Sequence, residues 1–467
     1  MSELEDRLAS RIAALEAVEH DRDDRILALE KVLEDAGLSD VPPKETWSVS
    51  QQNKESSSLV SVAVTCAETG AAFSFDGSKI HGTMFSPWLQ LERWQHLVST
   101  VKLRSSDIVV ATYPKSGTTL AEQAVIAFLS GARDASCFNV RDKNALGRRL
   151  HGGADTSANN THSHKTLGAE APTKTYAKVW PEACMGWKPG EDSGERQRGA
   201  EFVPVSWETF DALAPPRLIK THAPANLVPG DSLLRLVDSS TFATDRLGLE
   251  PSADGSRSEA RFVVVARTPK DVCTSCFYHA WNPCAQGWPF AAWAHAWSSG
   301  LVPSGSWAGW HRGWRERAST LGAERVLMLT YEELTSVDDS VRLGALAKLG
   351  VFVLQGESIG SGGGGGGRVE GSGGVGGEGE KAEEEEFEAL VKRVDALCNF
   401  EAMKKLSTAA SSADGGTGGG DSPVSHASHA SHLRHGRSGN WKAHFDAELA
   451  RTTVDAVCAE EAKEWGL

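Results

Sequence analysis

The chain has 467 residues, 40% of them hydrophobic, and a formal net charge of −14. This length accommodates a large α/β domain with appended segments, and the acidic balance argues against a nucleic-acid partner. No apolar run reaches the roughly 18 residues of a membrane span, the N-terminus is too acidic for a secretory signal, and the cysteines are scattered, so we expect no membrane partner and a cytoplasmic location.

Residues 1–36 predict a helix. Leu8, Leu15 and Leu29 lie seven or fourteen residues apart, as in a heptad seam, but Arg22 interrupts the series. Two interpretations remain, a coiled coil through which the protein self-associates or binds a partner, and a solvated amphipathic helix. Residues 37–84 are expected to form a linker, in which LVSVAV and AAFSF could pair as a short hairpin.

A strand, a small-residue loop and a helix are predicted between Asp107 and Leu129. The apolar run IVVA that begins at Ile108 is typical of a buried strand, Pro114 ends it, and SGTTL leads into apolar residues at helical spacing. Such a unit presents backbone N–H groups and a helix N-terminus to an anion, and Lys115 adds a positive charge. It is not a Walker A loop, because the lysine precedes the glycine. The loop either binds a phosphate or sulfate group or is an ordinary strand-to-helix turn with a surface lysine.

Two further predicted strand ends carry charged or titratable side chains. In RLIKTH, Lys220 and His222 are two residues apart, so in an extended chain they lie on the same face. A base beside a cation suits acid–base chemistry next to an anion; the other interpretation is a structural histidine. In RFVVVARTPKDVCTS, Arg267 follows a buried strand and can make a bidentate contact with phosphate, Asp271 is placed to cap the next helix, and Ser275 can add a hydroxyl.

Several other polar or aromatic patterns have two interpretations. Cys273 and Cys276 form a CxxC sequence inside a predicted helix without a thioredoxin context, so we interpret them as packing rather than redox residues. For the histidines within residues 141–200 and the row at residues 426–435, solvated loops are favoured over metal binding. The seven tryptophans of residues 281–314 are expected to be mainly core anchors, some of which could line an aromatic acceptor pocket.

Five separated strings resemble, in order, motifs of the PAPS-dependent cytosolic sulfotransferases, where PAPS is 3′-phosphoadenosine 5′-phosphosulfate. They are YPKSGTT, RLIKTH, the element that begins at Arg267, FEAMKK and RHGRSGNWK, and they span about three quarters of the chain. The resemblance implies a single α/β, P-loop-like domain with a mostly parallel central sheet flanked by helices. This chain adds the N-terminal helix and disordered polar or glycine-rich inserts. We place the domain at residues 85–467 and the inserts at about 141–200, 355–386 and 407–430.

The resemblance also implies a reaction, in-line transfer of the sulfuryl group from PAPS to a small-molecule acceptor (a phenol, alcohol or amine), with PAP as the other product. His222 would act as general base, Lys115 would stabilise the leaving oxygen, and Lys220 would hold the phosphosulfate. No metal is implied, because the lysines supply the charge. The other residues that the resemblance places around the donor are Ser116, Gly117, Thr118, Thr119, Leu120, Arg267, Ser275, Tyr331, Phe400, Arg434, His435 and Gly436.

The chain departs from the family pattern in several places. Leu120 stands where the family usually has a tryptophan that stacks on adenine, and His435 and Asn440 replace a lysine and an aspartate of the loop that wraps the 3′-phosphate. The family's short dimerisation pattern, KxxxTVxxxE, is not reproduced from Lys442 onward. The family dimer is therefore not expected, and the N-terminal helix is the alternative self-association contact.

Two other classes of protein make different demands on the sequence. A P-loop kinase or nucleotidase would require a Walker A loop, which is missing from the sequence. A non-catalytic scaffold would be expected to lose Lys115, Lys220 or His222, and all three are present. The sequence therefore predicts an enzyme whose acceptor the sequence does not specify.

Overall fold

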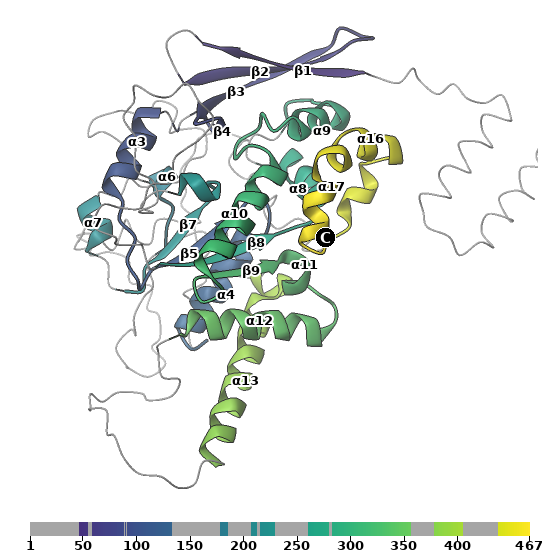
Figure 1. Cartoon of the computed structure of the whole chain (residues 1–467). Helices are drawn as coiled ribbons and strands as arrows, with labels where there is room; N and C mark the ends of the chain where they lie inside the picture. The colour runs from purple at the N-terminus through teal and green to yellow at the C-terminus, as the bar shows by residue number, and fades with distance from the viewer. Residues whose placement is uncertain are drawn as a thin grey trace, which may run out of the picture.

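Two β-sheets, with helices packed around them, organise the described part of the chain (Figure 1). The computed structural model describes residues 46–54, 58–87, 89, 91–132, 178–184, 207–212, 215–228, 260–279, 283–355, 378–404 and 438–467. The predicted N-terminal helix, the insert at 407–430 and most of the insert at 141–200 therefore lie outside the described residues.

The central sheet has five strands, all parallel, in the order β6-β7-β5-β8-β9. Their bounds are β5 (Ile108–Thr112), β6 (Lys178–Val179), β7 (Leu218–Thr221), β8 (Arg261–Ala266) and β9 (Val326–Thr330). Strand β5 lies between β7 and β8, so the strand order changes direction beside it, which is the topological switch point where α/β sheets bind ligands. The prediction of an α/β fold with a mostly parallel central sheet is confirmed.

Side chains of β5 alternate between two cores on opposite faces of the central sheet. Val109 and Ala111 pack into a core that contains the tryptophans of α9 and α10, and Ile108 and Val110 pack into a core made with α4, α12 and α13. All of them are fully buried, as predicted for a strand covered on both faces.

The helices are α3 (Leu91–Thr100), α4 (Thr118–Leu129), α6 (Pro181–Cys184), α7 (Trp207–Asp211), α8 (Pro269–Phe277), α9 (Phe290–Ser298), α10 (Trp307–Leu321), α11 (Tyr331–Leu334), α12 (Asp339–Val353), α13 (Glu378–Cys398), α16 (Ala447–Thr452) and α17 (Val454–Glu464), with 3-10 turns at Ala225–Leu227 and Asn440–Ala443.

The second sheet is antiparallel and corrects the expectation of a linker before the main domain. Its strands, in order, are β1 (Trp47–Asn53), β2 (Leu59–Cys66), β3 (Ala72–Ile80) and β4 (Thr83–Phe85). The expected hairpin is present as β2 and β3, but β1 also pairs with β2 along its whole length. The sequence WSVSQQN reads as a linker because its side chains are mostly polar; its buried anchor is Trp47, whose ring lies 6.0 Å from that of Phe73.

One helical segment also differs from the sequence-based expectation. Residues 378–386 belong to α13 rather than to a flexible insert, because glutamate, alanine and lysine favour helix and because Leu390 and Val391 anchor the helix in the core beside α4. The C-terminal helical residues form two helices, α16 and α17, which meet at Thr453, because its φ of −117° and ψ of −95° are not helical.

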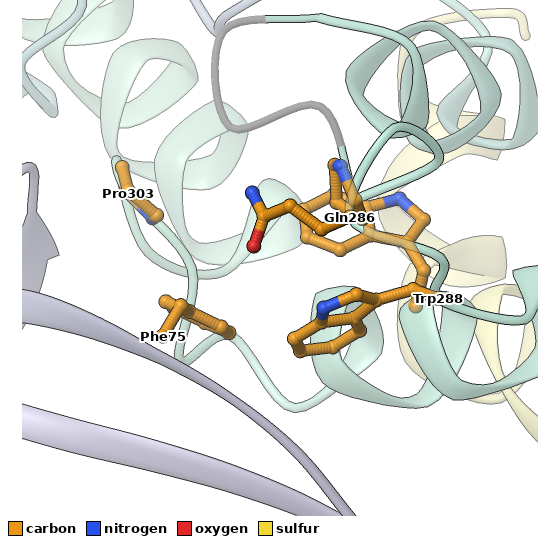
Figure 2. A pocket seen from close by; sticks show the side chains of 6 residues that line it. Phe75, Gln286, Trp288 and Pro303 are labelled. Atoms are coloured by element: carbon orange, nitrogen blue, oxygen red, sulfur yellow. The ribbon is translucent and has the colours of Figure 1, made fainter.

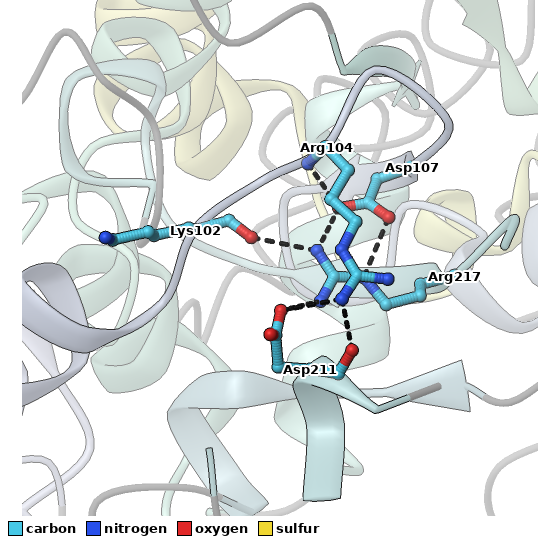
Figure 3. Close-up of polar contacts among 5 residues, drawn as sticks. All are labelled: Lys102, Arg104, Asp107, Asp211 and Arg217. Atoms are coloured by element: carbon cyan, nitrogen blue, oxygen red, sulfur yellow. Dashed lines mark hydrogen bonds and ion pairs between the residues drawn. The ribbon is translucent and has the colours of Figure 1, made fainter. Parts of the chain in front are cut away.

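A buried ion pair joins the beginnings of β5 and β7 (Figure 3). Arg217 donates from Nε to Oδ1 of Asp107 at 2.8 Å and from Nη2 to Oδ2 at 2.5 Å, and both side chains are fully buried. Arg217 Nη2 also donates to the carbonyl oxygen of Lys102 at 2.8 Å. Since β5 and β7 are parallel, a pair at their amino ends also fixes how their carboxyl ends, at Thr112 and Thr221, lie beside each other.

Candidate active site

Four neighbouring strands of the central sheet deliver predicted site residues at their carboxyl ends. Strand β5 is followed by the loop at residues 113–117, β7 by His222, β8 by Arg267 and β9 by Tyr331. Because parallel strands end at the same edge of a sheet, these residues lie along one edge, at the switch point.

The loop at residues 113–117 has a backbone conformation that requires glycine at one position. Lys115 has a φ of 71° and Gly117 a φ of 104°, and the N–H of Ser116 donates to the carbonyl oxygen of Tyr113 at 3.0 Å. A Cβ on Gly117 would lie 2.6 Å from Cδ2 of Tyr331. Both the left-handed backbone and the neighbouring tyrosine ring therefore favour glycine at this position.

The polar groups where this loop enters α4 have the properties of an anion site. The side chain of Ser116 is fully buried, and its Oγ has no hydrogen-bond partner among the described residues. Helix α4 begins at Thr118, and its N-cap residue, Gly117, gives the helix no side-chain cap. Helix N-terminal N–H groups without a cap, beside an unsatisfied hydroxyl, suit a bound phosphate or sulfate group. The hydroxyl of Thr118 is already shared with that of Thr112, at 2.5 Å, and Thr119 is partly exposed.

The imidazole of His222 is held in one orientation and one tautomer. Its Nδ1 lies 2.7 Å from the carbonyl oxygen of Thr112. A carbonyl oxygen only accepts, so Nδ1 carries the hydrogen, and Nε2 of the neutral ring keeps its lone pair. The indole Nε1 of Trp310 donates to the carbonyl oxygen of His222 at 3.1 Å, which fixes the backbone as well.

Two lysines surround His222 with positive charge. Lys220 Nζ lies 4.1 Å from the ring centre of Trp180, and the ring of His222 lies 5.1 Å from the same indole, so the lysine and the histidine share a face as predicted. Burial lowers the pKa of His222 to about 3, and the charges of Lys220 and Lys115 act in the same direction, against the hydrogen bond to Thr112. His222 is therefore neutral at physiological pH.

Arg267, the first residue after β8, contacts the loop at residues 113–117. Its Nη1 donates to the carbonyl oxygen of Lys115 at 3.2 Å, and its guanidinium carbon lies 4.3 Å from the ring centre of Tyr331. The two halves of the predicted donor site, one after β5 and one after β8, are therefore contiguous.

The role predicted for Asp271 was wrong. It does not cap α8, whose N-cap position is Thr268; it lies within the first turn of the helix. Its carboxylate instead accepts the backbone N–H of Gly439 at 2.6 Å and that of Trp441 at 3.2 Å. Asp271 thus ties the C-terminal loop to the helix that follows Arg267, a contact between residues far apart in the sequence.

Glu332 strengthens the same tie. Its Oε1 accepts the N–H of Thr268 at 3.1 Å and the hydroxyl of Thr268 at 2.8 Å, and it also accepts the hydroxyl of Ser438 at 3.1 Å. The residues just beyond Gly436 are therefore anchored beside Arg267.

Of the other predicted site residues, some are buried, some are partly exposed, and some lie outside the described residues. Leu120 is 8% exposed and packs in the core that includes residues of α12, so most of its side chain contacts the protein interior. Ser275, on α8, and Phe400, after α13, are both partly exposed. Arg434, His435 and Gly436 lie outside the described residues.

Two residues at this edge were assigned to a polar insert by the sequence. Trp180 and Glu182 follow β6, within the segment expected to be a solvated loop. Glu182 is 3% exposed and accepts a short hydrogen bond from the hydroxyl of Thr221. The signal that could have found them is the string KVWPE, a short apolar stretch followed by a proline at the first position of a helix.

The cysteines of the CxxC sequence are packing residues, as predicted. Cys273 and Cys276 are buried in α8 and unpaired. Burial raises the pKa of the Cys276 thiol to about 12, although the charges of Lys115 and Arg267 oppose the shift. The thiol is therefore protonated and unreactive under ordinary conditions.

A small apolar hollow lies between the antiparallel sheet and the segment that precedes α10 (Figure 2). Two of the tryptophans expected to be core anchors or acceptor contacts contribute to it. The residues that line it are Phe75, Pro283, Gln286, Trp288, Trp293 and Pro303. Acceptor binding to tryptophans of this segment stays a prediction.

The sequence of the region that carries these residues matches a known family. A profile described as the sulfotransferase domain matches residues 105–235 and 253–339, which include the loop after β5, His222 and Arg267. The chain belongs to the sulfotransferase domain family. The match confirms the family that the short motifs indicated, and the protein is accordingly a sulfotransferase.

Solved structures resemble this sulfotransferase at low sequence identity. A mouse sulfotransferase complexed with PAP is 14% identical, with 83% of this chain and 94% of that chain covered and a TM-score of 0.42. A retinol dehydratase in complex with retinol and PAP is 15% identical, with 90% of this chain and 97% of that chain covered and a TM-score of 0.47.

Within the described residues, His, Cys, Asp and Glu side chains nowhere gather in groups of three that could hold a metal ion. The helices of the described segments are too short or too polar to cross a membrane.

Proposed function

We propose that this sulfotransferase transfers the sulfuryl group of PAPS to a hydroxyl or amine group of a small-molecule acceptor and releases PAP, with His222 as general base. One observation carries the proposal. The Nδ1–H of His222 is bonded to the last residue of β5, and Lys115 and Lys220 are both close enough to lower its pKa. A neutral imidazole whose Nε2 lone pair is free, set between two cations, suits removal of a proton beside an anionic donor.

The loop after β5 fits the phosphosulfate end of the donor. The buried hydroxyl of Ser116 lacks a partner among the described residues, and Gly117 allows the left-handed turn that packs against the ring of Tyr331. Ser116, Gly117, Thr118 and Thr119 would hold the 5′-phosphate through backbone N–H and hydroxyl groups. Lys115, at the turn, would place its charge near the oxygen on which negative charge develops.

The elements after β8 and β9 fit the 3′-phosphate and the nucleoside. Arg267 presents a guanidinium, which is the side chain best suited to a bidentate phosphate contact, and Ser275 lies two turns further along α8. Arg434, His435 and Gly436 would complete this end of the site. Support comes from Asp271 and Glu332, which anchor the residues immediately beyond them. Leu120, Tyr331 and Phe400 stay our candidates for contacts with the nucleoside.

During transfer, an O–S or N–S bond forms to the acceptor and the S–O bond to the nucleotide phosphate breaks. His222 Nε2 would take the proton that the acceptor loses. Lys115 and Lys220 would stabilise the charge that develops on the departing oxygen. The indole of Trp180, in contact with both Lys220 and His222, supports an acceptor with an aromatic or apolar body.

The test is transfer of radiolabelled sulfate from PAPS to a panel of phenols, alcohols and amines. We expect His222→Ala to lower kcat about 100-fold to 10,000-fold, the usual contribution of a general base. Its dissociation constant for PAP should stay within about twofold, since His222 is not a donor contact. His295→Ala, which removes a partly buried histidine of α9, is the matched control and should leave kcat unchanged.

Two outcomes would contradict the proposal in different ways. Binding of ATP without binding of PAP would indicate a different nucleotide enzyme. Binding of PAP without turnover of any acceptor would favour a non-catalytic scaffold.

A further inference from the structure

Glu182 is a buried carboxyl group next to the candidate active site, and the reaction proposed above does not use it. It lies in α6, directly after Trp180, and α6 packs against β7. Its side chain is 3% exposed. Burying a carboxyl group is unfavourable unless its oxygens accept hydrogen bonds, so the contacts of Glu182 reveal why it is there.

The principal contact of Glu182 is the hydroxyl of Thr221, the residue between Lys220 and His222. The Thr221 hydroxyl donates a short hydrogen bond to Oε1 of Glu182. The same hydroxyl oxygen accepts the backbone N–H of Ala223 at 3.0 Å. The residues on both sides of His222 are thus joined to each other and to Glu182 by one hydroxyl group.

The opposite side of this turn is held by helix α10. Trp310 Nε1 donates to the carbonyl oxygen of His222 at 3.1 Å, and Trp314 Nε1 donates to the carbonyl oxygen of Ala223 at 3.4 Å. Glu182 therefore supplies, from α6, the counterpart of the two indole contacts. Without it, the Thr221 hydroxyl loses its acceptor, and the turn is held mainly from the α10 side.

This role does not depend on whether Glu182 is ionised. Burial raises the pKa of Glu182 to about 7, while the Thr221 hydrogen bond and the charge of Lys220 oppose the shift. A protonated carboxyl group still has a carbonyl oxygen that can accept from Thr221. A glutamine at this position would provide the same acceptor.

We propose that Glu182 is a positioning residue for sulfuryl transfer: through the Thr221 hydroxyl it fixes the turn that presents Lys220 and His222 to the reacting groups. This inference rests on the function proposed above. It predicts an effect on the chemical step rather than on donor binding, because the donor loop lies on β5 and α4. Small displacements of a catalytic group can reduce a rate by as much as about 100-fold.

The experiment compares four variants with the wild-type protein in the full chain. Glu182→Ala and Thr221→Val should each lower kcat about 10-fold to 100-fold, with the KM for the acceptor and the dissociation constant for PAP within about threefold. Glu182→Gln and Thr221→Ser keep the acceptor and the hydroxyl, and should retain most of the wild-type kcat. Circular dichroism and the thermal midpoint establish that each variant is folded, and Thr221→Val serves if Glu182→Ala does not fold.

A double variant and a spectrum separate positioning from a general structural effect. Glu182→Ala with Thr221→Val should be no slower than Thr221→Val alone, since that variant already removes the contact with Glu182 together with the one to Ala223. NMR of histidine ring nitrogens, assigned with His222→Asn, should show the Nδ1–H tautomer of His222 in the wild-type protein and a mixture of tautomers in Glu182→Ala.

Each failure has its own signature. A wild-type protein that binds PAP but turns over no acceptor contradicts the proposed function, whatever Glu182 does. An active wild-type protein with an equally active Glu182→Ala variant contradicts only the positioning role. A Glu182→Gln variant as slow as Glu182→Ala contradicts it too, because the ionisable group would then matter rather than the acceptor oxygen.

Discussion

The Nδ1–H of His222 and the carbonyl oxygen of Thr112 are joined by a hydrogen bond of 2.7 Å. Thr112 is the last residue of β5, and His222 is the first residue after β7, the parallel neighbour of β5. The hydroxyl of Thr112 in turn contacts that of Thr118, the first residue of α4. One threonine therefore links the proposed base to the loop proposed to hold the donor.

The pH dependence of the reaction should reveal how His222 is set. Its pKa is lowered to about 3, so the imidazole stays neutral, and able to accept a proton, until the pH falls through that value. We expect kcat/KM for the donor, which reports the free protein, to show no loss due to His222 between about pH 8 and about pH 5. The bound donor is anionic and should raise this pKa, so the acid limb of kcat should lie at higher pH than that of kcat/KM.

A lysine variant tests the cause of that low pKa. Lys115→Met removes a like charge near His222, so the acid limb of its residual kcat/KM should move to higher pH. Lys270→Met, which removes a lysine that pairs with Asp455, should leave the limb in place. An inflection near pH 6.5 in the wild-type kcat/KM would show that His222 is not held as described.

Gly117→Ala should damage the donor loop. Alanine disfavours a φ of 104°, and its Cβ would lie 2.6 Å from Cδ2 of Tyr331. Left-handed backbone alone costs an L-residue about 1–2 kcal/mol. We expect the dissociation constant for PAP, measured by calorimetry, to rise at least about tenfold, and the thermal midpoint to fall.

A glycine inside a helix provides the control for that substitution. At Gly313, in α10, a Cβ would meet only the Cβ of Ala225, at 3.9 Å. Gly313→Ala should leave PAP binding unchanged and stabilise the protein by up to about 1 kcal/mol. If Gly117→Ala binds PAP as the wild-type protein does, the loop does not have the role we propose.

Asp271→Ala should weaken donor binding although Asp271 is not proposed to contact the donor. The carboxylate holds the backbone of Gly439 and Trp441, next to the loop that would wrap the 3′-phosphate. Loss of about 1.4 kcal/mol of loop anchoring would raise the dissociation constant for PAP about tenfold. Asp271→Asn, which keeps one acceptor oxygen, should fall between the wild-type protein and Asp271→Ala.

The control for this prediction is a neighbouring aspartate. Asp455, on α17, pairs with Lys270, which lies beside Asp271 on α8, at 3.3 Å. Because Asp455 is 42% exposed, Asp455→Ala should change the affinity for PAP by less than about twofold. If Asp271→Ala binds PAP as tightly as the wild-type protein does, the C-terminal loop that Asp271 anchors does not contribute to donor binding.

Local sequence patterns predicted the strand ends at which the central candidate residues lie. The strand at Ile108, the loop with Lys115 and the spacing of Lys220 and His222 all depend on short-range rules, such as an apolar run that ends in proline and a period of two in a strand. The order of these strings along the chain is also the order of the corresponding motifs in the sulfotransferase family. The structure agrees because the carboxyl ends of β5, β7 and β8 meet at one edge of the sheet.

Contacts between distant parts of the sequence were not predicted. Asp271 was expected to cap its own helix, since its position allows that, but its partners are residues 439 and 441. Glu182 was hidden in a segment whose composition resembles a solvated loop. Strand β1 was read as a linker because only pairing with β2 makes such a polar strand stable. In each case the determining contact is tertiary, so no window of the sequence contains both partners.

The buried ion pair of Arg217 and Asp107 should be among the largest single contributions to stability. Both side chains are fully buried and joined by two hydrogen bonds, at 2.8 and 2.5 Å. Removal of Asp107 leaves the buried guanidinium of Arg217 with a longer ion pair, from Nη1 to Oδ1 of the half-exposed Asp211 at 3.4 Å. Breaking a buried pair usually costs about 3–5 kcal/mol. We expect Asp107→Ala to lower the free energy of unfolding by about that amount, measured by urea denaturation and tryptophan fluorescence.

Two comparisons distinguish the buried charge from a general effect of substitution. Asp76→Ala breaks the pair of Lys54 and Asp76, about half exposed on both sides, and should change stability by at most about 1 kcal/mol. Asp107→Leu combined with Arg217→Met removes both charges and should be less harmful than Asp107→Ala alone, since no charge is left unpaired. If the double variant is the less stable one, the pair contributes by attraction beyond its desolvation, and the alignment of β5 with β7 depends on that attraction.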